Sequence, residues 1–408
     1  MCRLPYCLVL CVESIEVNAI GKAQVFSGIV LAALLTMALV IVRLAYSENL
    51  PRQLNLHGGK AIYEAACAAC HGVDGSGAAP SATAFERPAS FPHFNKCDET
   101  TPEFARDYKA SIRDGGPARG FSMIMPSFSG VLTLKQMDEV IAYLRTLCKE
   151  QGWPLGELNL PRALMTEKAF PESETILTTT INAKGAGGIA NELVYERVLG
   201  KRDQLEVAAP FSWVHKESGG LTGGIGDIAV GDKHILYSKL NADPEQSAYE
   251  ATGVIVALQG EVVLATGDQK RGLGAGEPSY GVFAMVDELF PKQVFLEVQT
   301  GIDIPRHTEF APRSVYVRTA IGKSISGDEH LGRLWSPMVE FIANRDLTRG
   351  TMTDWDVIPE FQVTLNQRQH IRTAFGYRVP INDTAGRPKQ FIAYFLWDWF
   401  DGGLFEGW

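Results

Sequence analysis

The residues best suited to chemistry are Cys67, Cys70 and His71, which form a Cys-x-x-Cys-His motif. Two thiols at this spacing can add to the two vinyl groups of one haem, and the adjoining histidine can ligate the iron. A Cys-x-x-Cys pair alone would also suit zinc or a redox dithiol. Zinc requires a second pair of ligands, and none is suitably spaced in the sequence. The motif therefore predicts a single, covalently attached haem c.

The second axial ligand of the iron is expected downstream of the motif. Met125 lies in a loop before a predicted helix, and Pro126 stiffens the backbone that follows it. A methionine thioether stabilises ferrous iron and raises the reduction potential. Met123 is the alternative in the same loop, and His93 would instead give a bis-histidine site. A methionine that only fills the core and a histidine exposed in a surface loop are the ordinary interpretations of these residues.

Helices are expected to position these ligands. Residues 60–69 lead into the Cys-x-x-Cys-His motif, and residues 101–113 and 134–147 are predicted to form two further helices. In the last of these, apolar residues recur at helical spacing, and Thr133 is a plausible N-cap.

Residues 57–150 resemble a class I mono-haem cytochrome c. The resemblance is carried by Cys67-Ala-Ala-Cys70-His71-Gly and by Met125-Pro-Ser-Phe128 ahead of the last helix. It implies a compact all-α fold, haem attached to Cys67 and Cys70, and axial ligation by His71 and Met125. Arg113 or Arg119 could pair with a haem propionate, although a solvated loop arginine is the commoner case.

The N-terminal region predicts export from the cytoplasm. Residues 25–42 form an uncharged segment of 18 residues, which is just long enough for a membrane-spanning helix. Residues 1–47 therefore form either a signal peptide, cleaved near Ser47, or a retained membrane anchor. In an oxidising compartment Cys97 and Cys148 could form a disulfide; two buried free thiols are the alternative.

The remainder of the chain predicts an all-β domain. Residues 151–174 are rich in proline, glycine and charge, and are interpreted as a linker. From residue 175 to residue 408 the apolar residues alternate with polar ones, with about twelve such segments separated by turns. Residues 293–304, 356–366 and 370–379 are clear examples of this period-two pattern.

Two antiparallel architectures fit this alternation. We favour a closed barrel of about twelve strands in a membrane, because tryptophans gather near the predicted strand ends as they do at membrane interfaces. The domain resembles bacterial outer-membrane β-barrel proteins, without a diagnostic motif. The alternative is a soluble β-sandwich or barrel whose apolar face is its core. Pro337, Pro359 and the short tail after the last strand fit a continuous membrane ladder poorly. The tryptophans concerned are Trp335, Trp355, Trp397 and Trp399.

Composition and motifs limit the function. The formal charge is −9 and no Lys/Arg-rich block is present, so the sequence gives no support for nucleic-acid binding. We expect an electron carrier in the envelope of a Gram-negative bacterium, with a periplasmic haem domain, a β-domain in the outer membrane, and redox proteins as partners. A channel or transporter with a haem plug or redox sensor is one alternative.

The other alternative is an oxidoreductase whose β-domain passes electrons to the haem. Past residue 151 no His/Cys cluster with metal-ligand spacing is found, and no nucleotide loop or nucleophile–base motif. The five histidines of this region are interpreted as ordinary surface or loop residues. They are His215, His234, His307, His330 and His370.

Overall fold

The computed structural model describes residues 35–38, 55–83, 85–88, 91–182, 188–215, 220–242 and 248–408. The chain divides into two compact units, Met1–Gln53 and Leu54–Trp408. The predicted signal peptide or anchor at residues 1–47 lies almost entirely outside the described residues, so its fate stays a prediction. Within the described part of the chain, no helix combines the length and the apolar character needed to cross a membrane.

The first part of the larger unit is helical. Its core is formed where helix α2 (Gly59–Ala66) crosses helix α6 (Leu134–Arg145). The two helices are so close at Gly59 that a Cβ atom on this residue would lie 1.9 Å from the carbonyl oxygen of Glu139. The predicted cap at Thr133 is confirmed, since its side chain and that of Gln136 form a reciprocal capping box at the start of α6. The α-helices are α2 (Gly59–Ala66), α3 (Ala68–His71), α4 (Cys97–Thr100), α5 (Ala105–Asp114) and α6 (Leu134–Arg145).

Two details of the helical region refine the predictions from sequence. The predicted helix at 60–69 is interrupted at Cys67, and the one at 101–113 begins only at Ala105, because Pro102 has no N–H group with which to continue α4. Cys97 and Cys148 form a disulfide, with their Cα atoms 5.1 Å apart. This bond ties α4 to the segment after α6.

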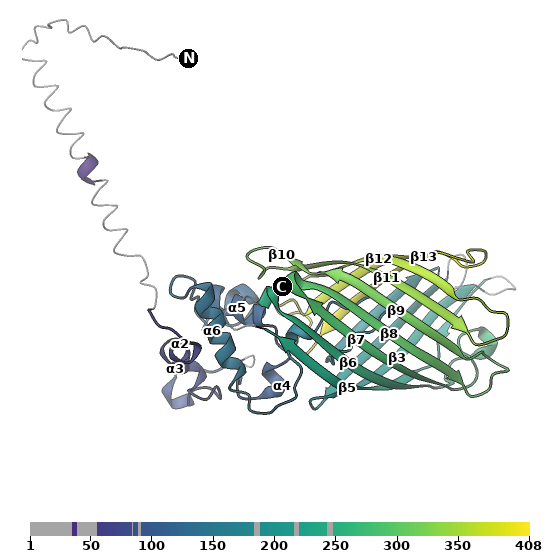
Figure 1. The fold of residues 1–408 in the computed structure, drawn as a ribbon, viewed down its shortest axis with the longest axis horizontal. Helices are drawn as coiled ribbons and strands as arrows, with labels where there is room; N and C mark the ends of the chain where they lie inside the picture. The colour runs from purple at the N-terminus through teal and green to yellow at the C-terminus, as the bar shows by residue number, and fades with distance from the viewer. Residues whose placement is uncertain are drawn as a thin grey trace, which may run out of the picture. The chain divides into compact units, whose positions relative to one another are not determined.

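The second part is a closed antiparallel β-barrel of twelve strands (Figure 1). Closure is achieved because β14 pairs with β1 and β9 pairs with β11. Two short strands, β4 (Leu221–Ile225) and β10 (Ile325–Ser326), extend the sheet at β3 and β11. The barrel strands are β1 (Glu174–Ile181), β2 (Ile189–Leu199), β3 (Asp203–His215), β5 (Ala229–Asn241), β6 (Thr252–Val263), β7 (Ser279–Phe290), β8 (Val294–Pro305), β9 (Ser314–Lys323), β11 (Leu334–Asp346), β12 (Asp354–Thr364), β13 (Ile371–Pro380) and β14 (Gln390–Asp398).

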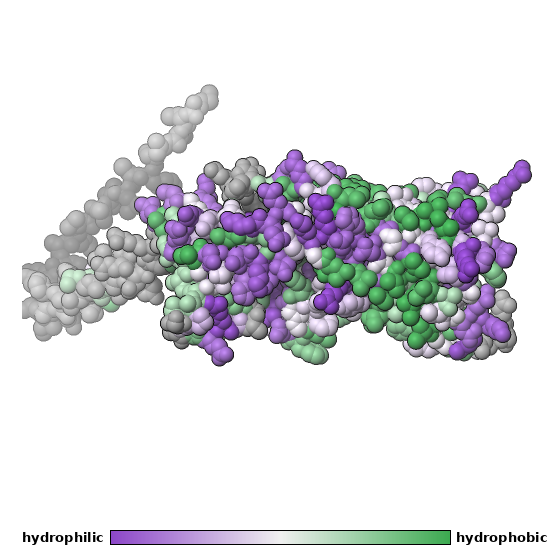
Figure 2. Space-filling view, turned by 90° about the horizontal axis from the view of Figure 1, so that it is seen from below, coloured by the Kyte–Doolittle hydropathy of each residue, from purple (hydrophilic) through white to green (hydrophobic). Residues whose placement is uncertain are grey.

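The barrel has its polar face inside. On β8 the side chains of Glu297 and Gln299 are fully buried, whereas outward-facing Phe341 on β11 and Tyr377 on β13 are each 45% exposed. Figure 2 shows hydrophobic side chains gathered over the barrel and bordered by hydrophilic ones. A water-soluble barrel would bury its apolar face instead. This arrangement favours the membrane barrel over the soluble alternative, because it is typical of a barrel whose outer surface meets lipid.

The barrel contains both prolines and the C-terminal tail that fitted a continuous membrane ladder poorly. Pro337 and Pro359 stand within the paired strands β11 and β12 and are both exposed on the outer face. The tail after β14 folds back on the β12–β13 loop, where Gln367 N–H donates to the carbonyl of Gly407 at 2.6 Å. His370, expected at the surface, is buried beneath this tail and lies 3.0 Å from the carbonyl of Gly403.

Most of the predicted linker at 151–174 runs inside the barrel. Residues 159–173, here named the lumen segment, offer backbone N–H groups to inward-facing side chains of the wall. Leu164 N–H donates to Glu360, Thr166 N–H to Glu340 and Ala169 N–H to Asp287, at 3.0, 2.7 and 2.7 Å. These acceptors lie on the neighbouring strands β11 and β12 and on β7, so the lumen segment is bound to more than one part of the barrel wall.

Candidate haem site

The predicted cysteines and histidine lie at the end of the first helix. Cys67 separates α2 from α3, and Cys70 and His71 belong to α3. The His71 N–H donates to the carbonyl of Cys67 at 2.9 Å, which brings the motif into one helical turn. Gly72 ends that turn with a φ of 74°, a conformation that glycine adopts without strain. Both thiols are free and half-buried.

These three residues line a cavity of about 370 Å³. The His71 ring lies between Phe91 and Phe94, with both ring centroids 4.9 Å from its own. Burial lowers the pKa of His71 to about 4, so the imidazole is neutral and able to ligate a metal. The remaining wall is largely apolar and includes Tyr63, Phe85, Tyr108, Ile112, Phe128, Val140 and Leu144.

Met125 lines the same cavity, 54 residues after His71 in the sequence. Its backbone carbonyl accepts a hydrogen bond from Gly116 N–H at 3.0 Å, which fixes the loop beside η2 (Gly116–Arg119). Met123, the alternative ligand, is 86% exposed and does not belong to the cavity wall. His93 lies outside the wall as well, with its Nδ1 2.9 Å from Glu99. The geometry therefore favours Met125 over both alternatives.

The residues present fit a c-type haem. One cavity collects two half-buried thiols, a neutral imidazole, a thioether and a largely apolar wall. His71 Nδ1 is buried and makes no hydrogen bond, so the ring is oriented by its aromatic neighbours. Burial, and secondarily the neighbouring Cys70, raises the pKa of the Cys67 thiol to about 11. Such donors suit iron in a porphyrin.

The two arginines considered from the sequence have different surroundings. Arg113 binds Asp114 and Asp328 and is not part of the cavity wall. Arg119 is buried, lines the cavity and forms an ion pair with Asp107 at 3.0 Å. Arg119 is therefore the one of the two that can reach a haem propionate.

Three further cavity residues were not identified from the sequence. Arg368, Phe400 and Asp401 belong to the barrel domain, from the β12–β13 loop and the chain after β14. Arg119 also donates a hydrogen bond to the carbonyl of Arg368 at 3.2 Å. No local pattern connects residues some 250 positions apart, so only the tertiary structure brings them to this site.

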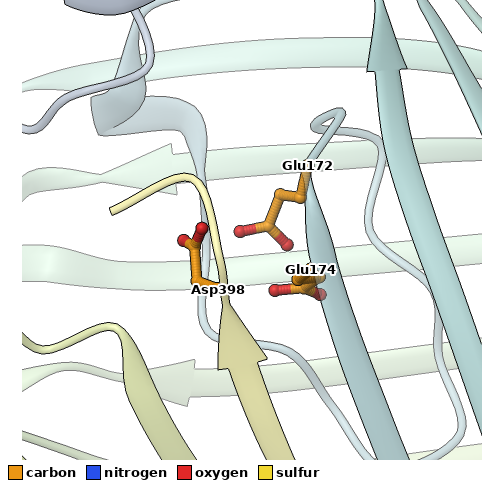
Figure 3. A group of neighbouring side chains, drawn as sticks. All are labelled: Glu172, Glu174 and Asp398. Carbon is orange, nitrogen blue, oxygen red and sulfur yellow. The ribbon is translucent and has the colours of Figure 1, made fainter. Parts of the chain in front are cut away.

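A separate cluster of carboxylates lies where the lumen segment meets the wall (Figure 3). Glu172, Glu174 and Asp398 are buried, with ligand oxygens within 4.8 Å of one another. Cationic side chains already neutralise them. Arg372 lies 3.6 Å from both Glu172 and Asp398, Arg162 lies 3.2 Å from Glu174, and Lys168 forms an ion pair with Glu172. The cluster is thus a network of internal ion pairs that attaches the lumen segment.

Comparisons with known proteins agree with the predicted first domain. The family model "Cytochrome c" matches residues 57–148, which form a cytochrome c domain. A comparison with curated proteins finds no match.

Solved porin barrels are similar to more than half of this chain. The KdgM porin is 6% identical, with 55% of this chain and 98% of that chain covered and a TM-score of 0.34. The NanC porin is 7% identical, with coverage of 55% and 97% and a TM-score of 0.35. The β domain of the Bordetella autotransporter BrkA is 9% identical, with coverage of 55% and 97% and a TM-score of 0.29. The strand pairing within this chain shows by itself that the barrel is closed.

Proposed function

We propose that this chain is an electron-transfer protein of the outer membrane of a Gram-negative bacterium, with the cytochrome c domain exposed to the periplasm. One haem is attached to Cys67 and Cys70, and its iron is ligated by His71 and Met125. The observation that carries the proposal is the single cavity in which these four residues meet. When bound, the haem supplies reversible one-electron chemistry.

The residues of the chain set the conditions for that chemistry. Phe91 and Phe94 pack against the His71 ring and hold it in one orientation. A methionine ligand favours the ferrous state. If His71 and Met125 both ligated the iron, no ligand position would be left for a substrate, which favours electron transfer over catalysis at the metal.

The barrel supports a location in the outer membrane. Its strands of 8 to 13 residues are long enough to cross a bilayer when tilted, and closure leaves no unpaired edge. This location requires release of residues 1–47 from the inner membrane, and therefore cleavage near Ser47.

A channel is the competing function, and the lumen segment argues against it. Hydrogen bonds from this segment to Glu340, Glu360 and Asp287 hold it against strands β11, β12 and β7 of the barrel wall. A solute would have to displace these contacts to pass. We therefore assign the barrel the role of locating the haem domain at the membrane. An oxidoreductase with its own site in the β-domain remains the third hypothesis, tested by adding small substrates and following reduction of the haem.

Membrane fractionation tests the proposal. Inner and outer membranes are separated, the covalent haem is detected by its peroxidase stain after denaturing electrophoresis, and the N-terminus of the mature chain is sequenced. We expect the stained band in the outer membrane, with a mature chain that begins near residue 48. Recovery in the soluble fraction, or a chain without stain, would overturn the proposal. A Cys67→Ala, Cys70→Ala variant is the control for non-covalent haem.

A further inference from the structure

Two buried arginines line the cavity of the cytochrome domain, and each has an unused donor. Arg119 comes from η2 and Arg368 from the β12–β13 loop of the barrel, within the same compact unit. Their exposed fractions are 6% and 8%. The Nε atoms of both are buried and make no hydrogen bond. A buried donor without an acceptor is costly, at about 1–3 kcal/mol, so two of them in one cavity indicate a missing acceptor.

The remaining groups of Arg368 are already engaged, which fixes its position. Nη2 donates to the carbonyl of Gly120 at 2.8 Å, and Nη1 donates to Glu406 at 2.5 Å. The guanidinium stacks over the ring of Phe121, 4.4 Å from its centroid. Because Gly120 and Phe121 directly follow η2, Arg368 is held against the same loop that carries Arg119.

Each arginine pairs with one carboxylate, Arg119 with Asp107 and Arg368 with Glu406, and both pairs leave the Nε donor free for a further anion. Asp107 pairs with Arg119, and Glu99 pairs with Lys96 and His93. The other two cavity carboxyls are Glu103 and Asp401. Burial raises the pKa of Glu103 to about 7 and also raises the pKa of Asp401, which reduces the negative charge of these two carboxyls at neutral pH.

Haem carries two propionate groups, which need cationic or hydrogen-bonding partners when they are taken out of water. We propose that Arg368, together with Arg119, binds the haem propionates, so that a loop of the barrel completes the haem site of the cytochrome domain. Arginine suits this role because its planar guanidinium presents fixed donors to a carboxylate. The inference rests on the covalent haem of the proposed function. It assigns the barrel a direct part in setting the reduction potential.

The test compares three full-length variants in detergent or nanodiscs. Arg368→Gln removes the charge, Arg368→Lys keeps it, and Arg333→Gln is the matched control. Arg333 also donates to a backbone carbonyl, that of Leu365, but lies outside the cavity. Ferric haem has one more positive charge than ferrous haem, so loss of a nearby cation favours the ferric state. We expect Arg368→Gln to lower the ferrous-to-ferric ratio at a fixed potential by roughly threefold to tenfold, tenfold being about 59 mV for one electron.

Resonance Raman spectra supply a second readout. The bending mode of the haem propionates responds to their hydrogen bonds, so we expect it to shift in Arg368→Gln and in Arg368→Lys but not in Arg333→Gln. Arg368→Lys should keep a potential close to that of the unmodified protein. If the Arg368→Gln protein cannot be produced in folded form, the propionate bending mode of Arg368→Lys tests the proposal instead. Covalent haem with an unchanged mode and an unchanged potential would overturn this inference alone, whereas absence of covalent haem would overturn the proposed function.

Discussion

Glu340 on β11 accepts a hydrogen bond at 2.7 Å from the backbone N–H of Thr166, which lies 174 residues earlier in the chain. The same carboxylate accepts the Thr166 hydroxyl at 2.6 Å and the Met165 N–H at 3.0 Å. One wall side chain therefore satisfies three donors of the lumen segment. This relationship makes the segment a bound element of the barrel.

We expect Glu340→Ala to loosen the lumen segment. The substitution leaves three buried donors without an acceptor, at a cost on the order of 1–3 kcal/mol for each. Measured in planar lipid bilayers, the variant should show ion conductance events that the unmodified protein lacks or shows rarely. Glu288→Ala, an exposed glutamate on β7, is the control and should leave conductance unchanged. Equal conductance in both variants would mean that other contacts hold the segment in place.

Substitution of the two methionines distinguishes the axial ligand. Met125→Ala should abolish the weak absorption band that arises from sulfur bound to ferric iron, and should lower the reduction potential. Met123→Ala changes an exposed side chain of the same loop and should leave both properties unaltered. If the band survived in Met125→Ala and was lost in Met123→Ala, Met123 would be the second axial ligand of the iron.

The disulfide between Cys97 and Cys148 should stabilise the cytochrome domain. It closes a loop with a sequence separation of 51 that contains Met125. The chain-entropy model gives about 4 kcal/mol for a loop of this size. We expect a Cys97→Ser, Cys148→Ser variant to lose the native haem spectrum at a lower temperature or denaturant concentration. An unchanged unfolding midpoint would show that the helical core alone sustains the domain. Thr146→Ala, near Cys148 at the end of α6, serves as the local control.

The stability of the cytochrome domain should fall as the pH rises from about 5 to above 7. Burial, and secondarily Asp107, raises the pKa of Glu103 from 4.5 to about 7 in the folded chain. The folded state therefore binds a proton more tightly than the unfolded state. The stabilisation is complete below pH 4.5 and is lost as the pH passes through 7. Denaturant titrations followed by the haem absorbance should show this decline, and Glu103→Gln should remove it. A decline of equal size in Glu103→Gln would assign the effect to another group.

Local patterns in the sequence were sufficient to predict a haem-binding motif and the type of each domain. The Cys67-x-x-Cys70-His71 spacing predicts haem because the two thiols and the ligand lie within five consecutive residues, so no distant contact is needed. Alternation with period two predicts strands for the same reason. Twelve barrel strands and the capped helix at Leu134–Arg145 confirm the predictions of secondary structure. The choice of Met125 over Met123 stays a prediction, and it agrees with the position of Met125 in the cavity wall.

The tertiary structure decided which face of each strand is buried, and what fills the barrel. Alternation is identical for a soluble barrel and a membrane barrel, and only closure shows that Glu297 points inward while Phe341 points outward. The lumen segment looked like part of a linker because its proline and charged residues lack periodicity. Its acceptors Glu340, Glu360 and Asp287 lie more than a hundred residues further along the chain. For the same reason, the sequence alone could not place Arg368 at the cavity of the cytochrome domain. The sequence determined chemistry and period, both local properties, whereas contacts between residues distant in the chain depend on how the barrel closes.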